Sequence, residues 1–202
     1  MYKMRHVASS ENTSVFLTAE FERFVYTWDL YSFKLVSKFE SVLDFGGKRL
    51  AISNDGKLCV AAAYNRKGIC LYDVATGVAI WNRKDIKHTQ AIKFSLNGDM
   101  IYVNIDDKYL LSIDSATGGN IKKDNKMSNI YQNPYNQYDC FLKGDNILKF
   151  GTAEIKSPTF AFLDIAPTDL GIAVSAVGNN LMFFNFNNEK IWEIIPQEGK
   201  HF

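Results

Sequence analysis

The sequence predicts an all-β fold made of repeats of one four-stranded antiparallel sheet. The phrase LYDVATGVAIW at residues 71–81 returns in altered form as LSIDSATGGNI at residues 111–121, with Asp73 and Asp114 41 residues apart. Turn residues interrupt β-rich runs every 8 to 10 positions, and no segment has the apolar periodicity of an amphipathic helix. Recurrence at about 40 residues indicates stacked copies of one supersecondary unit.

Residues 87–123 divide most clearly into four strands. Apolar runs and turns alternate there in the order 91–94, Asn97-Gly98, 100–103, 106–108, 109–113 and Asp114, and a fourth short strand follows Gly118. Short β-rich runs separated by turns of Asn, Asp and Gly are typical of an antiparallel meander.

We expect five such units within a single domain that spans residues 1–202. They lie at approximately residues 1–40, 45–84, 86–124, 127–157 and 158–197. The offset from the first turn to the polar residue that closes the third strand is 17 residues for Asn12 to Asp29, 17 for Gly56 to Asp73, 16 for Gly98 to Asp114 and 18 for Asp169 to Asn187. The fourth unit has no clear closing residue, and its presence follows from the 73-residue gap between Asp114 and Asn187, close to two periods.

A four-stranded unit repeated about every 40 residues predicts a β-propeller. Each small sheet has two apolar faces that it cannot bury alone, so copies of it pack against one another around an axis. The small residues of LCVAAAY (58–64) and GIAVSAV (171–177) fit sheets pressed between neighbours. Five units favour a closed five-bladed ring, and the alternative is an incomplete ring that associates with further copies or chains.

The repeats resemble those of WD-repeat propellers. The family's Trp-Asp dipeptide is present as Trp28-Asp29 in the first unit, and Tyr72-Asp73 takes its place in the second. In the third unit, His88 precedes the first strand and Asp114 ends the third strand. The resemblance implies a structural role for these repeat anchors: Trp28, Asp29, Tyr72, Asp73, His88, Asp107 and Asp114. The repeats are degenerate, because only Asp107 fills the position of the family's turn aspartate. Trp81 and Trp192 fall on fourth strands, which is similar to quinoprotein-type (YVTN-like) propellers.

The overall composition limits the classes of partner that we expect. The formal net charge is +1, with 47% hydrophobic and 22% charged residues, so nothing favours nucleic acid or an anionic membrane as a partner. No apolar run has the length of a membrane span or a signal peptide. The three cysteines are too few and scattered for a disulfide framework, and we expect buried free thiols in a cytoplasmic protein.

Motifs for catalysis are missing from the sequence. It contains no Gly-x-Ser-x-Gly, His-Glu-x-x-His, Cys-x-x-Cys or phosphate-binding glycine loop, and its three histidines fall in separate units. We therefore expect no enzyme activity, no metal and no cofactor. A five-bladed glycoside hydrolase remains an alternative if Asp44, Asp139 and Asp164 converge at the axis.

One segment has the composition of a binding surface. In NIYQNPYNQYDCF (129–141) the aromatic residues Tyr131, Tyr135 and Tyr138 alternate with Asn133, Asn136 and further amides. Large amphipathic rings beside adaptable amides are typical of contact surfaces, although an eroded blade covering its neighbour explains them too. With Arg66 and Lys108 as a basic rim, the segment predicts a non-catalytic scaffold that presents its loop face to another protein. A carbohydrate-binding propeller is the other alternative.

Overall fold

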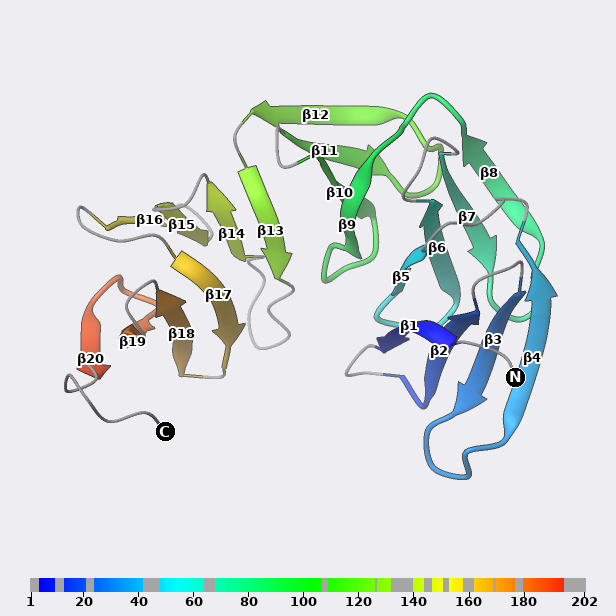
Figure 1. Ribbon diagram of the computed structural model, residues 1–202, viewed down its shortest axis with the longest axis horizontal. Coiled ribbons are helices and arrows are strands. Elements are labelled where there is room, and N and C mark those ends of the chain that lie inside the picture. The colour runs from blue at the N-terminus through cyan, green and yellow to red at the C-terminus, as the bar shows by residue number, and fades with distance from the viewer. Residues whose placement is uncertain are drawn as a thin grey trace. The chain divides into compact units, whose positions relative to one another are not determined.

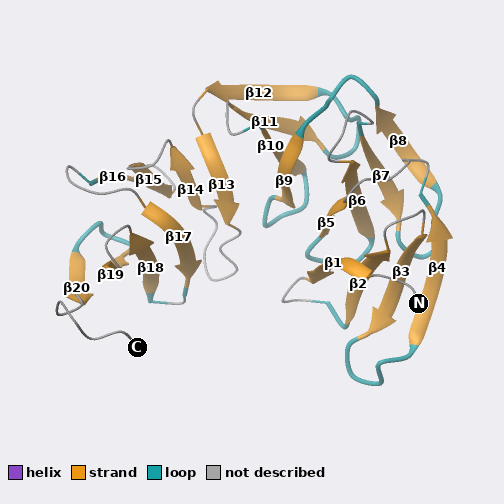
Figure 2. Cartoon of the chain, in the orientation of Figure 1, coloured by secondary structure: helices purple, strands orange, loops and turns teal. Residues whose placement is uncertain are grey.

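Alternating short runs of β-formers and turn residues fold as predicted into antiparallel sheets. The computed structural model describes residues 4–9, 13–20, 24–41, 48–63, 68–106, 109–125, 127–131, 140–143, 147–150, 153–157, 162–168, 170–176 and 180–194. Within these ranges the chain forms strands and turns only, without a helix (Figures 1 and 2). It divides into two units, Met1–Asn125 and Lys126–Phe202.

The first unit holds three four-stranded sheets, which we call blades 1 to 3. Each pairs its strands in chain order. Blade 1 consists of β1 (Met4–Ser9), β2 (Val15–Glu20), β3 (Phe24–Asp29) and β4 (Leu35–Glu40). Blade 2 consists of β5 (Lys48–Ile52), β6 (Leu58–Ala63), β7 (Ile69–Asp73) and β8 (Ala79–Arg83). Blade 3 consists of β9 (Thr89–Phe94), β10 (Met100–Ile105), β11 (Tyr109–Asp114) and β12 (Asn120–Asn125).

The second unit holds two further sheets of the same order, blades 4 and 5. Blade 4 consists of β13 (Met127–Tyr131), β14 (Cys140–Lys143), β15 (Ile147–Phe150) and β16 (Ala153–Lys156). Blade 5 consists of β17 (Phe162–Pro167), β18 (Gly171–Ala176), β19 (Asn180–Asn185) and β20 (Lys190–Ile194). All-β architecture and the four-stranded antiparallel unit are confirmed, including the fourth unit, whose sequence has no clear closing residue.

The strand registers align the blades and correct one prediction. Asp29 lies opposite Val15, Asp73 opposite Leu58 and Asp114 opposite Met100. In blade 5 the residue at this position is Asn185, opposite Gly171, and not the predicted Asn187. Asn187 lies two residues beyond the strand, in the turn that Asn185 closes through its side chain.

Blade 2 buries one face against blade 1 and the other face against blade 3. Successive residues of β6 point to opposite sides, so Cys59 and Ala61 join the core with blade 1, while Val60 and Ala62 join the core with blade 3. Because both faces of β6 are buried, small side chains suit it, as predicted. β18 buries Ile172, Val174 and Ala176 on one face only, and the two residues between them are half-buried.

The cysteines of blade 2 behave as core residues. Cys59 and Cys70 are buried thiols outside any disulfide, as predicted, and burial raises the pKa of the Cys70 thiol. Among the described residues there is no helix with the length and hydropathy needed to cross a membrane.

Candidate functional site

In blades 1 to 3, an aspartate closes the third strand and builds the turn that follows it. Asp73 Oδ1 accepts hydrogen bonds from the amide and the hydroxyl of Thr76, both at 2.8 Å, and Asp114 Oδ1 accepts the same pair from Thr117 at 2.7 Å. Because these donors stabilise the charged carboxylate, the pKa values of Asp73 and Asp114 are lowered. This role explains why the Asp-Val/Ser-Ala-Thr-Gly phrase recurs.

The fourth residue after the aspartate adopts a left-handed conformation. Gly77 has φ +70° and Gly118 has φ +72°, and each donates its amide to the carbonyl of the aspartate four residues before it. A left-handed residue without a Cβ suits glycine best. A methyl group at Gly77 would also lie 2.4 Å from Cβ of Phe39, so the turn of blade 2 leaves no room for a side chain there.

The last strand of one blade contacts this turn in the next blade. Ser37 of β4 and Trp81 of β8 hold equivalent positions, opposite Thr27 and Leu71. The Ser37 hydroxyl donates to the carbonyl of Val74 at 3.4 Å. The Trp81 indole donates to the carbonyl of Ser115 at 2.8 Å. Val74 and Ser115 each follow the turn aspartate directly, so one contact repeats between two pairs of blades.

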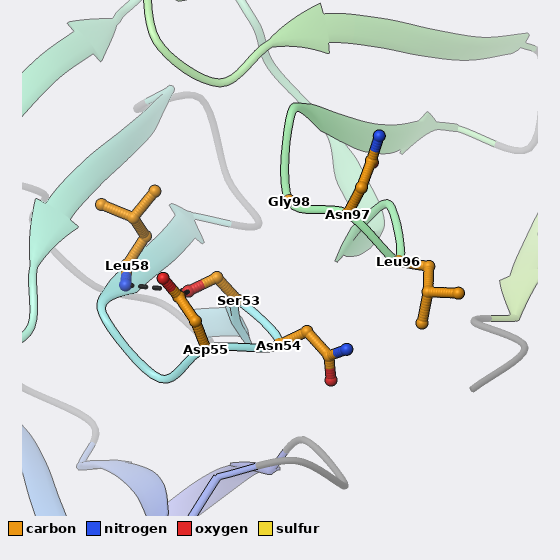
Figure 3. A pocket seen from close by; sticks show the side chains of 7 residues that line it. All are labelled: Ser53, Asn54, Asp55, Leu58, Leu96, Asn97 and Gly98. Atoms are coloured by element: carbon orange, nitrogen blue, oxygen red, sulfur yellow. Dashed lines mark hydrogen bonds between the residues drawn. The ribbon is translucent and has the colours of Figure 1, made fainter. Parts of the chain in front are cut away.

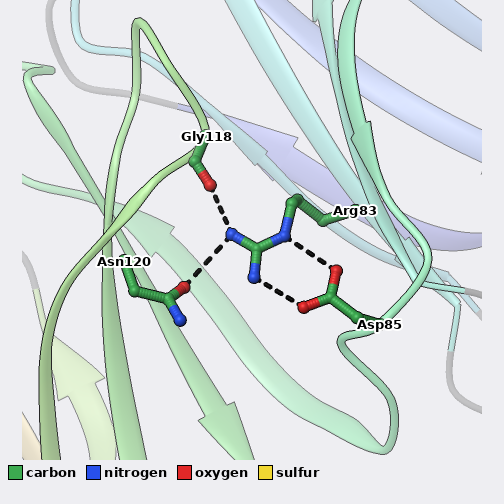
Figure 4. A network of polar contacts seen from close by, with 4 residues as sticks. All are labelled: Arg83, Asp85, Gly118 and Asn120. Carbon is green, nitrogen blue, oxygen red and sulfur yellow. Dashed lines mark hydrogen bonds and ion pairs between the residues drawn. The ribbon is translucent and has the colours of Figure 1, made fainter.

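Arg83 provides a second contact between blades 2 and 3, shown in Figure 4. Its guanidinium group donates to the carbonyl of Gly118 and, at 3.1 Å, to Oδ1 of Asn120. Asp85 holds the guanidinium group from the other side through two hydrogen bonds of 2.8 and 2.6 Å. In blade 1 the equivalent of Arg83 is Phe39, which packs against Gly77. These contacts explain how the blades of the first unit are joined.

Blade 1 departs from the pattern at its own turn. Asp29 accepts hydrogen bonds from the amide and hydroxyl of Ser32 at 2.7 Å, as its counterparts do from threonine. The fourth residue after Asp29, however, is Phe33, with φ +53° and 71% of its surface exposed. A bulky residue in this conformation is uncommon and strained, because Cβ crowds the backbone.

Phe33 belongs to an exposed apolar surface, which we call the turn patch. Its members are Leu30, Tyr31, Phe33, Leu35 and Val36, exposed by 41%, 80%, 71%, 50% and 59%. At the positions of Tyr31 and Phe33, blade 2 has Ala75 and Gly77, and blade 3 has Ala116 and Gly118. Blade 1 has therefore replaced the two smallest turn residues with aromatic ones.

The turn patch adjoins an aromatic face of blade 1. Phe16, Tyr26 and Trp28 are stacked, with ring centroids 6.1 to 6.3 Å apart, and Lys38 Nζ lies 3.7 Å from the Phe24 centroid. These residues alternate along their strands with buried residues such as Leu17 and Val25, which pack against blade 2. Leu35 pairs with Trp28, so the aromatic face continues into the turn patch.

A pocket lies between corresponding turns of blades 2 and 3 (Figure 3). Its volume is about 410 Å³. The turn between β5 and β6 contributes most of its wall, and the turn between β9 and β10 contributes the rest, giving the lining Ser53, Asn54, Asp55, Leu58, Leu96, Asn97 and Gly98. Asp55 Oδ1 accepts hydrogen bonds from the Ser53 hydroxyl at 2.7 Å and the Lys57 amide at 3.1 Å, which lower the pKa of Asp55.

The predicted repeat anchors that the structure describes make contacts within the fold. Trp28 donates its indole hydrogen to Thr18 Oγ1 at 2.8 Å, and the buried Tyr72 hydroxyl lies 2.8 Å from Ser41 Oγ. His88 Nδ1 lies 3.9 Å from a carboxylate oxygen of Asp106. Asp107, the anchor predicted from the family resemblance, lies outside the described residues.

Of the predicted partner-binding residues, only Tyr131 falls on a described strand. Tyr131 ends β13, but its side chain is not described. The others lie outside the described residues: Asn133, Tyr135, Asn136, Tyr138, Arg66 and Lys108. Sequence reasoning missed the turn patch, although comparing Asp-Leu-Tyr-Ser-Phe with the two Asp-x-Ala-Thr-Gly turns would have found it.

Solved structures resemble this chain over most of its length. Hydrazine synthase of Kuenenia stuttgartiensis is 14% identical, with a TM-score of 0.65 over 90% of this chain and 62% of that chain. The Cps50 (Swd1) β-propeller domain of Myceliophteria thermophila is 13% identical, with a TM-score of 0.69 over 93% and 71% of the two chains. Dihydro-heme d1 dehydrogenase NirN, in complex with DHE, is 17% identical, with a TM-score of 0.71 over 95% and 46%.

These similarities establish a β-propeller fold. The chain spans less than two thirds of the hydrazine synthase and NirN chains. No protein-family model and no curated protein matches it. The resemblance to WD-repeats in particular therefore stays a prediction.

The expectation of no enzyme activity, drawn from the missing catalytic motifs, is corrected by these similarities. Hydrazine synthase and the dehydrogenase NirN are enzymes, and both match this chain in fold. A propeller without familiar catalytic motifs therefore does not exclude catalysis. At 14% and 17% identity, these similarities support the fold and no particular reaction.

Proposed function

We propose that this protein is an interaction module and that the turn patch of blade 1 is the surface that contacts a protein partner. The observation that carries the proposal is Phe33, an exposed aromatic residue in a left-handed conformation at a position where blades 2 and 3 have glycine. Backbone strain combined with exposure of a large apolar side chain destabilises the free protein, and such costs concentrate at functional surfaces.

The chemistry of the patch suits protein recognition. Tyr31 and Phe33 are exposed rings, and the exposed aliphatic residues Leu30, Leu35 and Val36 lie within three positions of Phe33 in the sequence. Clustered rings of this kind serve as anchors at protein interfaces, because they bury a large apolar area at little loss of conformational freedom. Burying one such side chain contributes roughly 1.5–3 kcal/mol.

Phe33 also distinguishes this turn from the turns of blades 2 and 3. In blades 2 and 3 the corresponding glycine lies against the last strand of the preceding blade, at Phe39 and Trp81. A side chain in place of Gly77 would overlap Phe39, so Phe33 does not fit that mode of blade contact. The first turn is therefore suited to a different partner.

Quantitative affinity capture from native cell extract tests the proposal. The bait proteins are the wild type, the double variant Tyr31→Ser/Phe33→Gly and a control, Val78→Ser, which changes a 61% exposed apolar residue in the turn of blade 2. We expect a partner whose affinity for the double variant is at least about tenfold weaker, and unchanged for the control, with direct binding measured on the purified partner.

A further bait separates the two candidate surfaces. Tyr135→Ser/Tyr138→Ser alters the tyrosine and amide segment that the sequence predicts as a contact surface. If the partner is lost with this variant and retained with Tyr31→Ser/Phe33→Gly, the turn patch is not the contact surface. If all baits retain the same proteins equally, neither surface is.

A further inference from the structure

The pocket between blades 2 and 3 is a second candidate site, separate from the turn patch. We propose that it binds a cationic peptide side chain, with the ammonium or guanidinium group on Asp55 and the aliphatic stem on Leu58 and Leu96. The inference does not depend on the proposed role of the turn patch.

The charge at the pocket is negative and fixed in place. Asp55 is the charged residue among the described residues that line it. Its Oδ1 is held by the Ser53 hydroxyl and the Lys57 amide, so the carboxylate is already oriented before a ligand arrives. These donors stabilise its charged form and lower its pKa.

The second oxygen of this carboxylate is accessible to an incoming cation. Asp55 Oδ2 lies 3.3 Å from Lys57 Nζ, and the side chains of Lys57 and Asp55 are 78% and 54% exposed. Ion pairs this exposed contribute about 0–1 kcal/mol, so a ligand ammonium exchanges with Lys57 at little cost. Asp55 already forms with Lys57 the kind of ion pair that it would form with a ligand.

The remaining walls match the rest of a lysine or arginine side chain. Leu58, at the start of β6, and Leu96, in the turn before β10, are half-buried, which suits a stem of methylene groups. The Asn97 amide is oriented by its own contacts: Oδ1 accepts from the Ser95 hydroxyl and Nδ2 donates to Asp99, both at 2.8 Å. A volume of about 410 Å³ accommodates one long side chain.

Nuclear magnetic resonance of the uniformly 15N-labelled chain tests the site. The probes are the methylamides of acetyl-lysine, acetyl-arginine and acetyl-norleucine, the last carrying an uncharged stem. We expect saturable amide shifts at residues 53–58 and 96–98 with a cationic probe, with a Kd on the order of millimolar, and none with norleucine. Equal shifts with norleucine, or no saturable shifts with either cation, would overturn the proposal.

Two variants test whether the Asp55 carboxylate is the group that binds the cation. Asp55→Asn keeps an acceptor for Ser53 and Lys57, so the turn is retained, and we expect cation binding at least fivefold weaker. Asp124→Asn removes a carboxylate from β12 of blade 3, at a residue that neither lines the pocket nor orients a lining residue, and we expect less than a twofold change. Equal losses in both variants would show only a general charge effect and would contradict a site on Asp55, as would unchanged binding by Asp55→Asn.

Discussion

The indole nitrogen of Trp81 donates a hydrogen bond of 2.8 Å to the carbonyl oxygen of Ser115 in the next blade. Ser37, at the same position one blade earlier, donates to the equivalent carbonyl, that of Val74. Two different side chains therefore use one backbone acceptor, which the aspartate turn presents. Blade-to-blade contact in the first unit depends on this turn, and the first predictions follow from that dependence.

Replacing Trp81 by phenylalanine should destabilise the first unit by about 1–2 kcal/mol. The ring still packs near Gly118, but the half-buried indole loses its hydrogen bond and the Ser115 carbonyl loses a donor. Urea unfolding measures the change. Trp192→Phe is the matched control: that residue holds the same position in blade 5, is 40% exposed, and its indole has no hydrogen bond among the described residues. Equal effects would contradict the role of the Trp81 bond.

Two glycines with similar backbone angles should respond differently to alanine. Gly77 and Gly98 have φ +70° and +78°, so alanine is strained at both, by about 1 kcal/mol. At Gly98 nothing lies within 4 Å of the added methyl group, whereas at Gly77 it would overlap Phe39. Thermal unfolding should show Gly77→Ala as the less stable variant, by roughly 1–3 kcal/mol beyond Gly98→Ala. Equal stability would argue against close contact at Gly77.

Phe33→Gly should stabilise the fold while weakening partner binding. Glycine relieves the left-handed strain of Phe33, and after allowing for its greater freedom in the unfolded chain we expect a gain of about 0.5–1 kcal/mol. Chemical unfolding and a binding assay on the same preparation measure both effects. A variant that is less stable than the wild type would show that Phe33 is a packing residue.

The turn aspartates should make the fold sensitive to acid. Hydrogen bonds from Ser32, Thr76 and Thr117 lower the pKa values of Asp29, Asp73 and Asp114 in the folded state. A depressed folded pKa gives stability that is present above the unfolded pKa of about 3.9 and is lost as the pH falls through the folded value. The free energy of unfolding, measured between pH 2.5 and 7, should therefore decline below about pH 4.

Neutral acceptors at these positions provide the control for the acid effect. Asp73→Asn/Asp114→Asn retains oxygen acceptors for the two threonines but removes two titrating groups. The decline in stability below about pH 4 should be shallower in this double variant than in the wild type. An identical acid profile would show that these two turns do not contribute to it.

The repeat could be predicted because its turn chemistry is local. Asp73, Thr76 and Gly77 close a turn through bonds within five residues, so their spacing identifies the end of a strand without tertiary information. The end of β19 was misplaced because Asn185 and Asn187 are chemically alike and only the register against β18 distinguishes them.

The candidate site was harder to predict because its signal is a departure from the repeat. Phe33 in the sequence looks like one more aromatic residue in a β-rich chain. Its meaning depends on knowing that the equivalent position requires a left-handed backbone and contacts the neighbouring blade. The pocket at Asp55 depends on two turns, 42 residues apart from Gly56 to Gly98, lying side by side. Sequence periodicity does not reveal that these two turns lie side by side.

Site-specific photo-crosslinking tests most directly whether the turn patch contacts a protein. A benzophenone amino acid replaces Tyr31 in one sample and Ala75, its equivalent in blade 2, in the other, and both proteins are irradiated in native cell extract. We predict a discrete adduct with a partner protein from position 31 and none from position 75. The same adducts from both positions, or no adduct from position 31, would contradict the account.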